Sequence, residues 1–368
     1  MSAPDPVPAI PPVCAADAER LAAERLSPQV WDFIAGGSGD ESVQAANRAA
    51  LDRMRLVPRV LSAVPREADT SGPLLRGTAR MPVAVAPMAY QRLLHPDGEL
   101  ATARAARDAG VPFVIPMLSS QPLERVAASG AVVWLQLYWL RDRGRMLELV
   151  RRAEHAGCAA VVVTVDVPFM GRRRRDLRNG FTLPPTVFPV HLGAEAARAT
   201  HIRRSGSSAL AVHSAADFDP FAGWADLAWL RDSTELPLVV KGVLAPRDAA
   251  LAVEHGADAV VVSNHGGRQF AGAPASITAL RPVVEEVAGG CAVLFDSGVR
   301  DGMDVLRALA CGADGVMYGR PVLWGLAADG EAGVRGVLDL LRAELREALA
   351  LSGCADVPAA RRLTTVGL

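Results

Sequence analysis

The sequence predicts an α/β protein folded as a (β/α)8 TIM barrel, and two observations support this prediction. Eight short apolar runs recur along the 368 residues, and helical stretches separate most of them. The runs are apolar on both faces, which is typical of parallel strands buried between layers. Eight β-then-α units in series favour a closed barrel. A doubly wound open sheet is the structural alternative.

The expected strands are short and rich in β-branched residues. They are PVAVAP (82–87), PFVIP (112–116), VWLQLY (133–138), AVVVTVD (160–166), PLVVKG (237–242), AVVVSN (259–264), AVLFDS (292–297) and GVMYGR (315–320). The stretches with helical apolar spacing each end near a glycine, which favours helix termination. They are ELATARAARDAG (99–110), RMLELVRRAEHAG (145–157), PRDAALAVEHGA (246–257) and GMDVLRALACGA (302–313).

The remaining segments extend this barrel. Residues 1–20 are proline-rich and are expected to form a disordered tail, followed by a single barrel domain over residues 21–368. Residues 21–75 look helical, so we expect an N-terminal helical extension that covers the bottom or side of the barrel. The loop after the fourth strand, residues 167–236, is long enough to be functional. Residues 335–354 are expected to form a long closing helix.

Composition argues against several classes of protein. The net charge of −1 gives no electrostatic reason to expect nucleic acid or an acidic membrane as a partner. No apolar run reaches the roughly 20 residues that cross a bilayer. The first residues lack the pattern of a signal peptide, so we expect a cytoplasmic protein. The five cysteines form no CxxC pair and have no histidine at metal-ligand spacing, so we expect buried thiols and no metal site.

Lysine occurs once, at Lys241, although lysine and arginine together number 39. Arginine does not replace lysine where a compact, mobile ammonium is needed. Because Lys241 stands near the end of an expected strand, PLVVKG, we take it as a candidate functional residue.

Polar side chains follow the apolar runs where the expected strands end. The carboxyl ends of the strands meet at one rim of a (β/α)8 barrel, and active sites lie at that rim. The rim positions are Ala86, Pro87, Met88, Gln136, Tyr138, Thr164, Asp166, Lys241, Ser263, His265, Asp296, Gly319 and Arg320. So many polar groups at one rim indicate an active site.

Two glycine-arginine segments end the last two strands and predict a phosphate site. They are FDSGVRDG (295–302) and MYGRP (317–321). Glycine lets the backbone approach a ligand closely, and the guanidinium of arginine binds phosphate as a fork. The loops after strands seven and eight are the usual phosphate site of this architecture. The sequence has neither GxGxxG nor GxxxxGK[ST], which argues against a Rossmann dinucleotide site and a P-loop.

The stretch VVVSNHGGRQF (260–270) indicates a base and an anion clamp on one turn. His265 follows one strand and Asp166 ends another, and a carboxylate beside an imidazole orients it and raises its basicity. Arg268 can bind a carboxylate through two parallel hydrogen bonds. Lys241 fits two tasks, either as a fixed cation beside a flavin or as a Schiff-base amine.

These motifs resemble the FMN-dependent 2-hydroxy acid oxidases and dehydrogenases. The resemblance runs over roughly residues 20–365 and is carried by SNHGGRQ, LQLYW, TVDVPFMGRR, LVVKG and the two phosphate loops. WDFIAGGSGDE, APMAYQRLLHPDGE and DVPFMGRRRRDLRNGF are most similar to members that oxidise 4-hydroxymandelate for antibiotic biosynthesis. The resemblance implies oxidation of an (S)-2-hydroxy acid, mandelate or 4-hydroxymandelate, to the 2-keto acid. FMN would be the cofactor, and oxygen the acceptor that gives hydrogen peroxide.

The resemblance also implies a role for each matching position. The catalytic group is His265, as the base, with Asp166, Tyr138, Arg268 and Lys241. The substrate would be bound by Tyr138, Arg173, His265 and Arg268, with Phe33 beside it. The flavin ring would be held by Ala86, Pro87, Met88, Ala89, Gln136, Thr164, Lys241 and Ser263. The ribityl phosphate would be held by Asp296, Gly298, Arg300, Gly319 and Arg320.

Several positions depart from the pattern of the family. Many members have a tyrosine where this chain has Phe33, and glycolate oxidases have a tryptophan where Leu118 falls. Both changes widen the pocket and make it more apolar, which favours an aromatic substrate. The other departures, which bear on cofactor affinity and fine specificity, are Pro116, Met117, Ala271 and Ser297.

Four alternatives stay open from the sequence. A member of the same family could pass electrons to a quinone or a protein, or could act on aliphatic acids such as lactate. A colourless aldolase or isomerase could use Lys241 as a Schiff base. A barrel kept only for assembly or ligand sensing is the non-catalytic alternative. A hydride route and a carbanion route both remain, and the family resemblance implies a homotetramer.

Overall fold

The computed structural model describes residues 12–65, 67–193 and 216–367. Eight parallel strands close into a barrel in the order β10-β11-β4-β5-β6-β7-β8-β9, and β9 pairs with β10 to complete the ring. The strands are β4 (Val83–Val85), β5 (Phe113–Ile115), β6 (Val133–Tyr138), β7 (Ala160–Thr164), β8 (Leu238–Val243), β9 (Ala259–Val262), β10 (Ala292–Phe295) and β11 (Gly315–Tyr318). Each begins within one of the eight expected runs, so the predicted (β/α)8 fold is confirmed.

Alternate side chains along each strand face the inside of the barrel and the surrounding helices. Along β9, Ala259 and Val261 belong to the small inner cluster, whereas Val260 and Val262 pack in the large outer cluster. Trp134 of β6 and Met317 of β11 also fill the inside. The barrel is therefore a packed core, and its free volume lies at the rim where the strands end.

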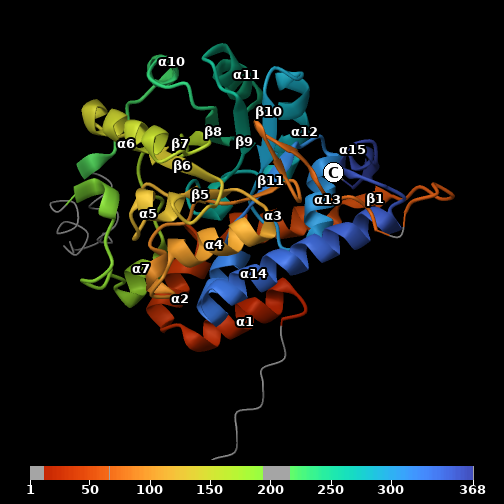
Figure 1. Ribbon diagram of the computed structural model, residues 1–368, viewed down its shortest axis with the longest axis horizontal. Helices are drawn as coiled ribbons and strands as arrows, with labels where there is room; N and C mark the ends of the chain where they lie inside the picture. The colour runs from red at the N-terminus through yellow and green to blue at the C-terminus, as the bar shows by residue number, and fades with distance from the viewer. Residues whose placement is uncertain (1–11, 66, 194–215, 368) are drawn as a thin grey trace, which may run out of the picture.

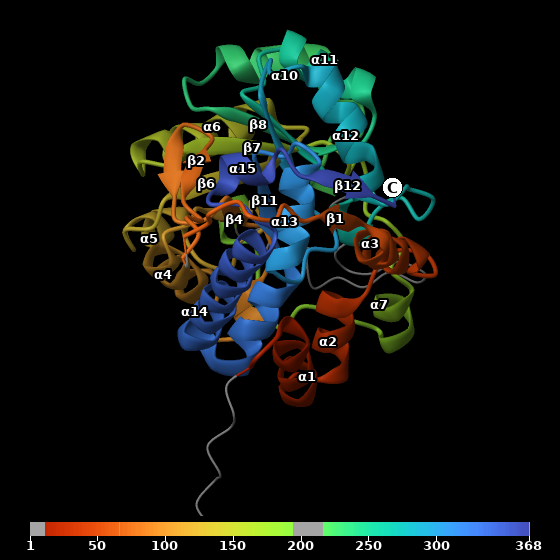
Figure 2. The same cartoon turned by 90° about the vertical axis from the view of Figure 1, so that its right-hand side faces the viewer.

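Helices cover the outside of the barrel. Figures 1 and 2 show α10 (Trp224–Asp232), α11 (Pro246–Glu254) and α12 (Ser276–Val287) on one side of the molecule. The opposite side carries α4 (Glu99–Ala109) and α14 (Arg320–Leu351). The other helices of the β-then-α units are α5 (Leu123–Ala127), α6 (Arg143–His155) and α13 (Gly302–Ala310).

Local sequence signals set several helix ends. Gly110 ends α4 in the left-handed conformation, at φ 69°, as the glycine after ARDA predicted. At the other end of a helix, the side chain of Asp301 accepts a hydrogen bond from Asp304 N and caps α13. This cap matters for function because α13 starts directly after one predicted phosphate loop.

The N-terminal part is less uniformly helical than expected. It holds α1 (Ala15–Arg25), α2 (Pro28–Ala35) and α3 (Ser42–Arg53), and also the short strands β1 (Arg55–Val57), β2 (Gly72–Leu74), β3 (Gly77–Ala79). The helix α1 begins at Ala15, so the last residues of the expected 1–20 tail are helical, whereas residues 1–11 lie outside the described part. Strand β1 pairs with β12 (Thr364–Val366) near the C-terminus.

The closing helix is longer than the sequence predicted. It begins at Arg320 rather than near residue 335. The helix α14 therefore starts directly after the MYG of the last phosphate loop. Its backbone breaks at Asp329 and at Gly330, where φ is 56°, and this break hides the first turns from a search for helical periodicity.

The connection after β7 carries structure of its own. Its described parts contain α7 (Arg174–Asn179), the short 3-10 helix η2 (Val190–Leu192) and α10. Residues 194–215 of the expected long loop lie outside the described residues. Among the helices that the structure describes, none is both long and apolar enough to span a membrane.

Candidate active site

The turn after β9 holds His265 in an unusual backbone conformation. His265, Gly266 and Gly267 all have positive φ, at 58°, 64° and 73°. A Cβ on Gly266 would lie 2.8 Å from Arg320 Nη1, and one on Gly267 would lie 2.8 Å from Gln44 Cγ. The two glycines are therefore required by both conformation and space, and the left-handed histidine is a strained position of the kind found at functional sites.

A carboxylate orients the imidazole of His265. The Nδ1 atom lies 2.9 Å from Asp166 Oδ1, at the end of β7, as the sequence predicted. With Nδ1–H donating to this carboxylate, Nε2 is the nitrogen that can accept a proton. Burial lowers the pKa of His265, and the neighbouring charge of Asp166 opposes this effect without cancelling it. The histidine is thus a neutral base near pH 7.

Lys241 is a buried cation with two partners. Its Nζ lies 2.9 Å from Asp296 Oδ2 and donates a hydrogen bond to Ser263 Oγ at 3.0 Å. Burial alone would lower its pKa, but Asp296 and Asp166 raise it. A lysine held charged in this way is a poor Schiff-base nucleophile, which counts against the aldolase alternative.

Asp296 was expected to help hold the ribityl phosphate. Its carboxylate pairs with Lys241, and Ser297 Oγ donates to its Oδ1 at 2.7 Å. Asp296 also lines the cavity, and its contact with the cofactor stays a prediction. Ser297 itself has φ 82°, and its Oγ also accepts from Asn264 N and Gly266 N.

Four arginines gather at the same cavity. Arg173, Arg268, Arg300 and Arg320 all line it. Burial, and then the charges of its arginine neighbours, lower the pKa of Arg268 and of Arg320. Because arginine stays charged in proteins, this cluster calls for bound anions. It fits the phosphate of FMN at one end and a carboxylate at the other.

Two of these guanidinium groups share a backbone acceptor. Arg268 Nη1 donates to Gly36 O at 2.7 Å, and Arg320 Nη2 donates to the same oxygen at 3.0 Å. Gly36 follows the last residue of α2. Arg320 also donates to the carbonyl oxygens of Gly266 and Ile34. The C-terminus of α2 therefore fixes the arginines of both predicted anion sites.

Most of the predicted site residues line this one cavity. They are Phe33, Ala86, Pro87, Met88, Ala89, Tyr138, Arg173, Lys241, His265, Arg268, Asp296, Gly298, Arg300, Gly319 and Arg320. The other predicted residues lie behind the lining. Ser263 supports Lys241, Asp166 supports His265, and Gln136 Nε2 donates to Thr164 Oγ1 at 3.1 Å. Contact of Gln136, Thr164 and Ser263 with the flavin stays a prediction.

Aromatic rings shape the end of the cavity near Arg173. Phe33 stacks on Phe181 with ring centroids 4.5 Å apart, and the guanidinium groups of Arg268 and Arg173 lie 5.5 and 5.8 Å from the Phe33 ring. The tyrosine hydroxyl that many members have at this position is absent here. Tyr138 stacks on Phe218, with ring centroids 4.7 Å apart.

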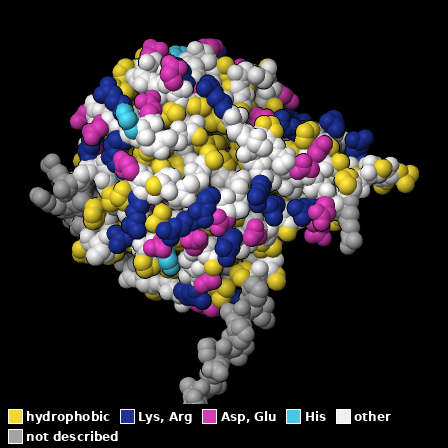
Figure 3. Space-filling view, viewed as in Figure 1, with side chains coloured by type: hydrophobic (Ala, Val, Ile, Leu, Met, Phe, Trp, Pro, Cys, Tyr) yellow, Lys and Arg dark blue, Asp and Glu magenta, His cyan; other side chains and the backbone are white. Residues whose placement is uncertain are grey.

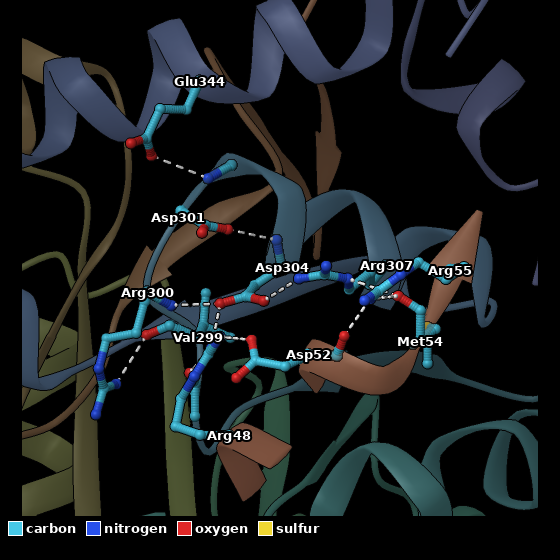
Figure 4. A network of polar contacts seen from close by, with 12 residues as sticks. Arg48, Asp52, Met54, Arg55, Val299, Arg300, Asp301, Asp304, Arg307 and Glu344 are labelled. Carbon is cyan, nitrogen blue, oxygen red and sulfur yellow. Dashed lines mark hydrogen bonds and ion pairs between the residues drawn. The ribbon is translucent and has the colours of Figure 1, made fainter. Parts of the chain in front are cut away.

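Sequence reasoning missed the support beneath the phosphate loop, which Figure 4 shows. Arg48 of α3 bonds to the side chain of Asp304 and donates to Gly298 O at 2.5 Å. Asp304 is fully buried and also accepts from Arg300 N at 2.9 Å and from Arg307 Nη1 at 2.7 Å. No local motif could reveal this network, because Arg48 and Asp304 are 256 residues apart.

The fold and site together define the class: an FMN-dependent barrel oxidoreductase. A family model described as FMN-dependent dehydrogenase matches residues 22–365. The chain therefore belongs to the FMN-dependent dehydrogenase family.

Relatives of known activity cover almost the whole chain. It is 54% identical to 4-hydroxymandelate oxidase of Amycolatopsis orientalis, over 96% of this chain and 98% of that protein. It is 45% identical to L-lactate oxidase of Nostoc sp., over 92% and 94%, and 43% identical to human 2-hydroxyacid oxidase 1, over 94% of each. A crystal structure of mandelate oxidase with (S)-4-hydroxymandelic acid aligns with a TM-score of 0.93 at 53% identity, over 96% of this chain and 99% of that one.

The network beneath the phosphate loop yields a first prediction. Arg48→Met removes the donors to Gly298 O and Asp304. A hydrogen bond between charged groups contributes about 1.5–3 kcal/mol, so we expect the dissociation constant of FMN to rise roughly tenfold or more. Titration of apoprotein with FMN, followed by flavin fluorescence, measures this constant.

Arg20→Met is the matched control. Arg20 is 62% exposed, and its ion pair among the described residues is with Glu24 on α1, so FMN affinity should stay unchanged in that variant. An Arg48→Met protein that melts earlier but binds FMN as tightly as the wild type would show that the network supports the fold alone.

Proposed function

We propose that this enzyme oxidises an aromatic (S)-2-hydroxy acid, mandelate or 4-hydroxymandelate, to the 2-keto acid and passes the electrons to oxygen. The observation that carries the proposal is the position of His265, which contacts Asp166 and lines the same cavity as Arg268 and Lys241. The names of the relatives support the choice of substrate.

The substrate binds at the arginine end of the cavity, which is formed by Arg173 and Arg268. Arg268 and Arg173 supply the positive charge for the carboxylate, and Tyr138, which lines the same cavity, supplies a hydroxyl. Burial raises the pKa of Tyr138, so this phenol stays a hydrogen-bond donor at neutral pH. The carboxylate then fixes the α-carbon in front of His265.

Proton removal falls to His265. Its Nε2 accepts a proton from the substrate, and Asp166 stabilises the resulting imidazolium through Nδ1. FMN, when bound, would supply the acceptor for the two electrons that the α-carbon loses. A hydride route and a carbanion route both require the histidine to start neutral. Lys241 places a fixed positive charge in the same cavity.

The apolar wall of the cavity favours an aromatic side chain. Leu118, Val167 and Met170 line it together with Phe33. A phenyl ring buries far more apolar area against such a wall than the hydrogen of glycolate, and apolar burial contributes about 25 cal/mol per Å².

The proposal is tested by mixing the enzyme with substrate without air and then admitting air. We expect (S)-mandelate and 4-hydroxymandelate to bleach the flavin absorbance fastest, lactate more slowly and glycolate least. Rapid return of the colour in air, with one peroxide per turnover, is the result expected of an oxidase. A clear preference for glycolate would refute the aromatic assignment, and slow recolouring would favour a quinone or protein acceptor.

His265→Ala is the control for the chemistry. This variant should retain FMN, because the side chain is not needed to hold it, and should lose reduction by every acid tested. Fast bleaching in this variant would remove His265 from the mechanism.

The histidine also predicts a pH dependence. Because burial lowers the pKa of His265 from its ordinary 6.5, kcat/KM should stay level through neutral pH and fall only at a more acidic pH. Asp166→Asn removes the charge that raises this pKa, so the acid limb should move to still lower pH while the maximal rate drops. An acid limb that moves upward in this variant would contradict the pairing.

We also propose a homotetramer, as the family resemblance implies. Its support in the described residues is the arm after β1, which projects at the right of Figure 1 and is apolar at its tip in Figure 3. There Val60 is 82% exposed and Leu61 is fully exposed. Light scattering should give four chain masses for the wild type and a smaller particle for the Val60→Asp, Leu61→Asp double variant. A wild-type monomer would end this proposal.

A cytoplasmic location and a place in antibiotic biosynthesis complete the proposal. The place in biosynthesis rests on the likeness to 4-hydroxymandelate oxidase, and the location follows the expectation from the sequence. Cell fractionation tests the location, and accumulation of the 2-hydroxy acid in cells that lack this enzyme tests the pathway.

A further inference from the structure

Tyr90 has a buried hydroxyl that the proposed mechanism does not use. It follows the loop after β4, with φ 60°, and only 2% of the residue is exposed. Tyr90 lines the active-site cavity. Among the residues that the structure describes, Tyr90 Oη has no hydrogen-bond partner.

An unpaired buried hydroxyl is costly and calls for an explanation. Leaving such a group unsatisfied costs about 1–3 kcal/mol, and most buried polar groups in native proteins are paired. A phenylalanine would fill the same space without that cost. The hydroxyl therefore points to a partner that arrives with the ligand.

The backbone places Tyr90 on the apolar wall of the cavity. Tyr90 N donates to Leu118 O at 3.2 Å, so the loops after β4 and β5 are joined at this point. In the strand order of the barrel, β5 lies four strands away from β9 in either direction. Leu118 is thus across the barrel from the turn that carries His265 and Arg268, and Tyr90 is bonded to Leu118 through the backbone.

This arrangement sets the orientation of the substrate in the cavity. A 2-hydroxy acid whose carboxylate lies at Arg268 and whose α-carbon faces His265 extends its side chain toward the opposite wall. A substituent at the far end of a phenyl ring would then meet Tyr90. Arg173 Nε, a second buried donor without a partner among the described residues, lines the same cavity.

We propose that Tyr90 Oη is a hydrogen-bonding subsite for a hydroxyl group on the aromatic ring of the substrate. This inference rests on the proposed function and deepens it, since it selects 4-hydroxymandelate over mandelate. A phenol both donates and accepts a hydrogen bond, so two phenols can pair in either direction. Sites built to bind a hydroxyl discriminate against ligands that lack it, because the protein group is then left unpaired.

Binding of the two keto acids to the oxidised holoenzyme tests the inference without turnover. The probes are benzoylformate and 4-hydroxybenzoylformate, and the change in flavin absorbance on binding gives each dissociation constant. In Tyr90→Phe we expect the affinity for 4-hydroxybenzoylformate to fall at least tenfold and the affinity for benzoylformate to stay within twofold. The melting temperature should be equal or higher, because the variant loses only an unsatisfied hydroxyl.

Tyr138→Phe is the matched comparison. Its hydroxyl is assigned to the carboxylate, which both keto acids share, so this variant should weaken both ligands alike. Equal losses in Tyr90→Phe, or no loss for either ligand, would overturn the subsite. A lower melting temperature would also overturn it, since the hydroxyl would then have a structural partner. If the wild type bound neither keto acid, the proposed function would fail together with the subsite.

Discussion

The concentration of positive charge at one end of the barrel is the constraint on which the rest of the site depends. Arg173, Arg268, Arg300, Arg320 and Lys241 share one partly enclosed cavity. Only Lys241 has a carboxylate within ion-pair distance among the contacts described here, namely that of Asp296. Arg268, Arg300 and Arg320 instead donate to backbone carbonyls, as at Gly36, Val299 and Gly266. Their charge is thus available to bound anions, which the proposed function identifies as a phosphate ester and a carboxylate.

The barrel holds these positive charges close together because each charged group is attached to a different element. His265 and Lys241 come from strand ends, Arg320 from the first residue of α14, and the carbonyl of Gly36 from the end of α2. Asp304 at the start of α13 anchors the loop that carries Arg300. Because these elements belong to one packed core, the like charges cannot relax apart, and the site stays preorganised for anions.

The sequence predicted the barrel and the convergence of its rim residues because strand order alone brings the carboxyl ends together. It paired His265 with Asp166 on the same ground. It could not pair Lys241 with Asp296 or Arg48 with Asp304, since those contacts depend on side-chain reach across distant elements. The beginning of α14 was hidden by a backbone break at Gly330. The role proposed for Tyr90 could not be predicted, because no sequence motif marks this residue. An unpaired hydroxyl is recognised only when the positions of its neighbours are known.

The shared acceptor at Gly36 has a consequence for protein engineering. One main-chain oxygen holds both Arg268 and Arg320, so any substitution that shifts the end of α2 moves both guanidinium groups at once. If Arg268 binds the acid and Arg320 the phosphate, as proposed, altering this corner to broaden the range of accepted acids also loosens retention of the prosthetic group. Remodelling is better directed at the wall around Leu118, which bears no part of that common anchor.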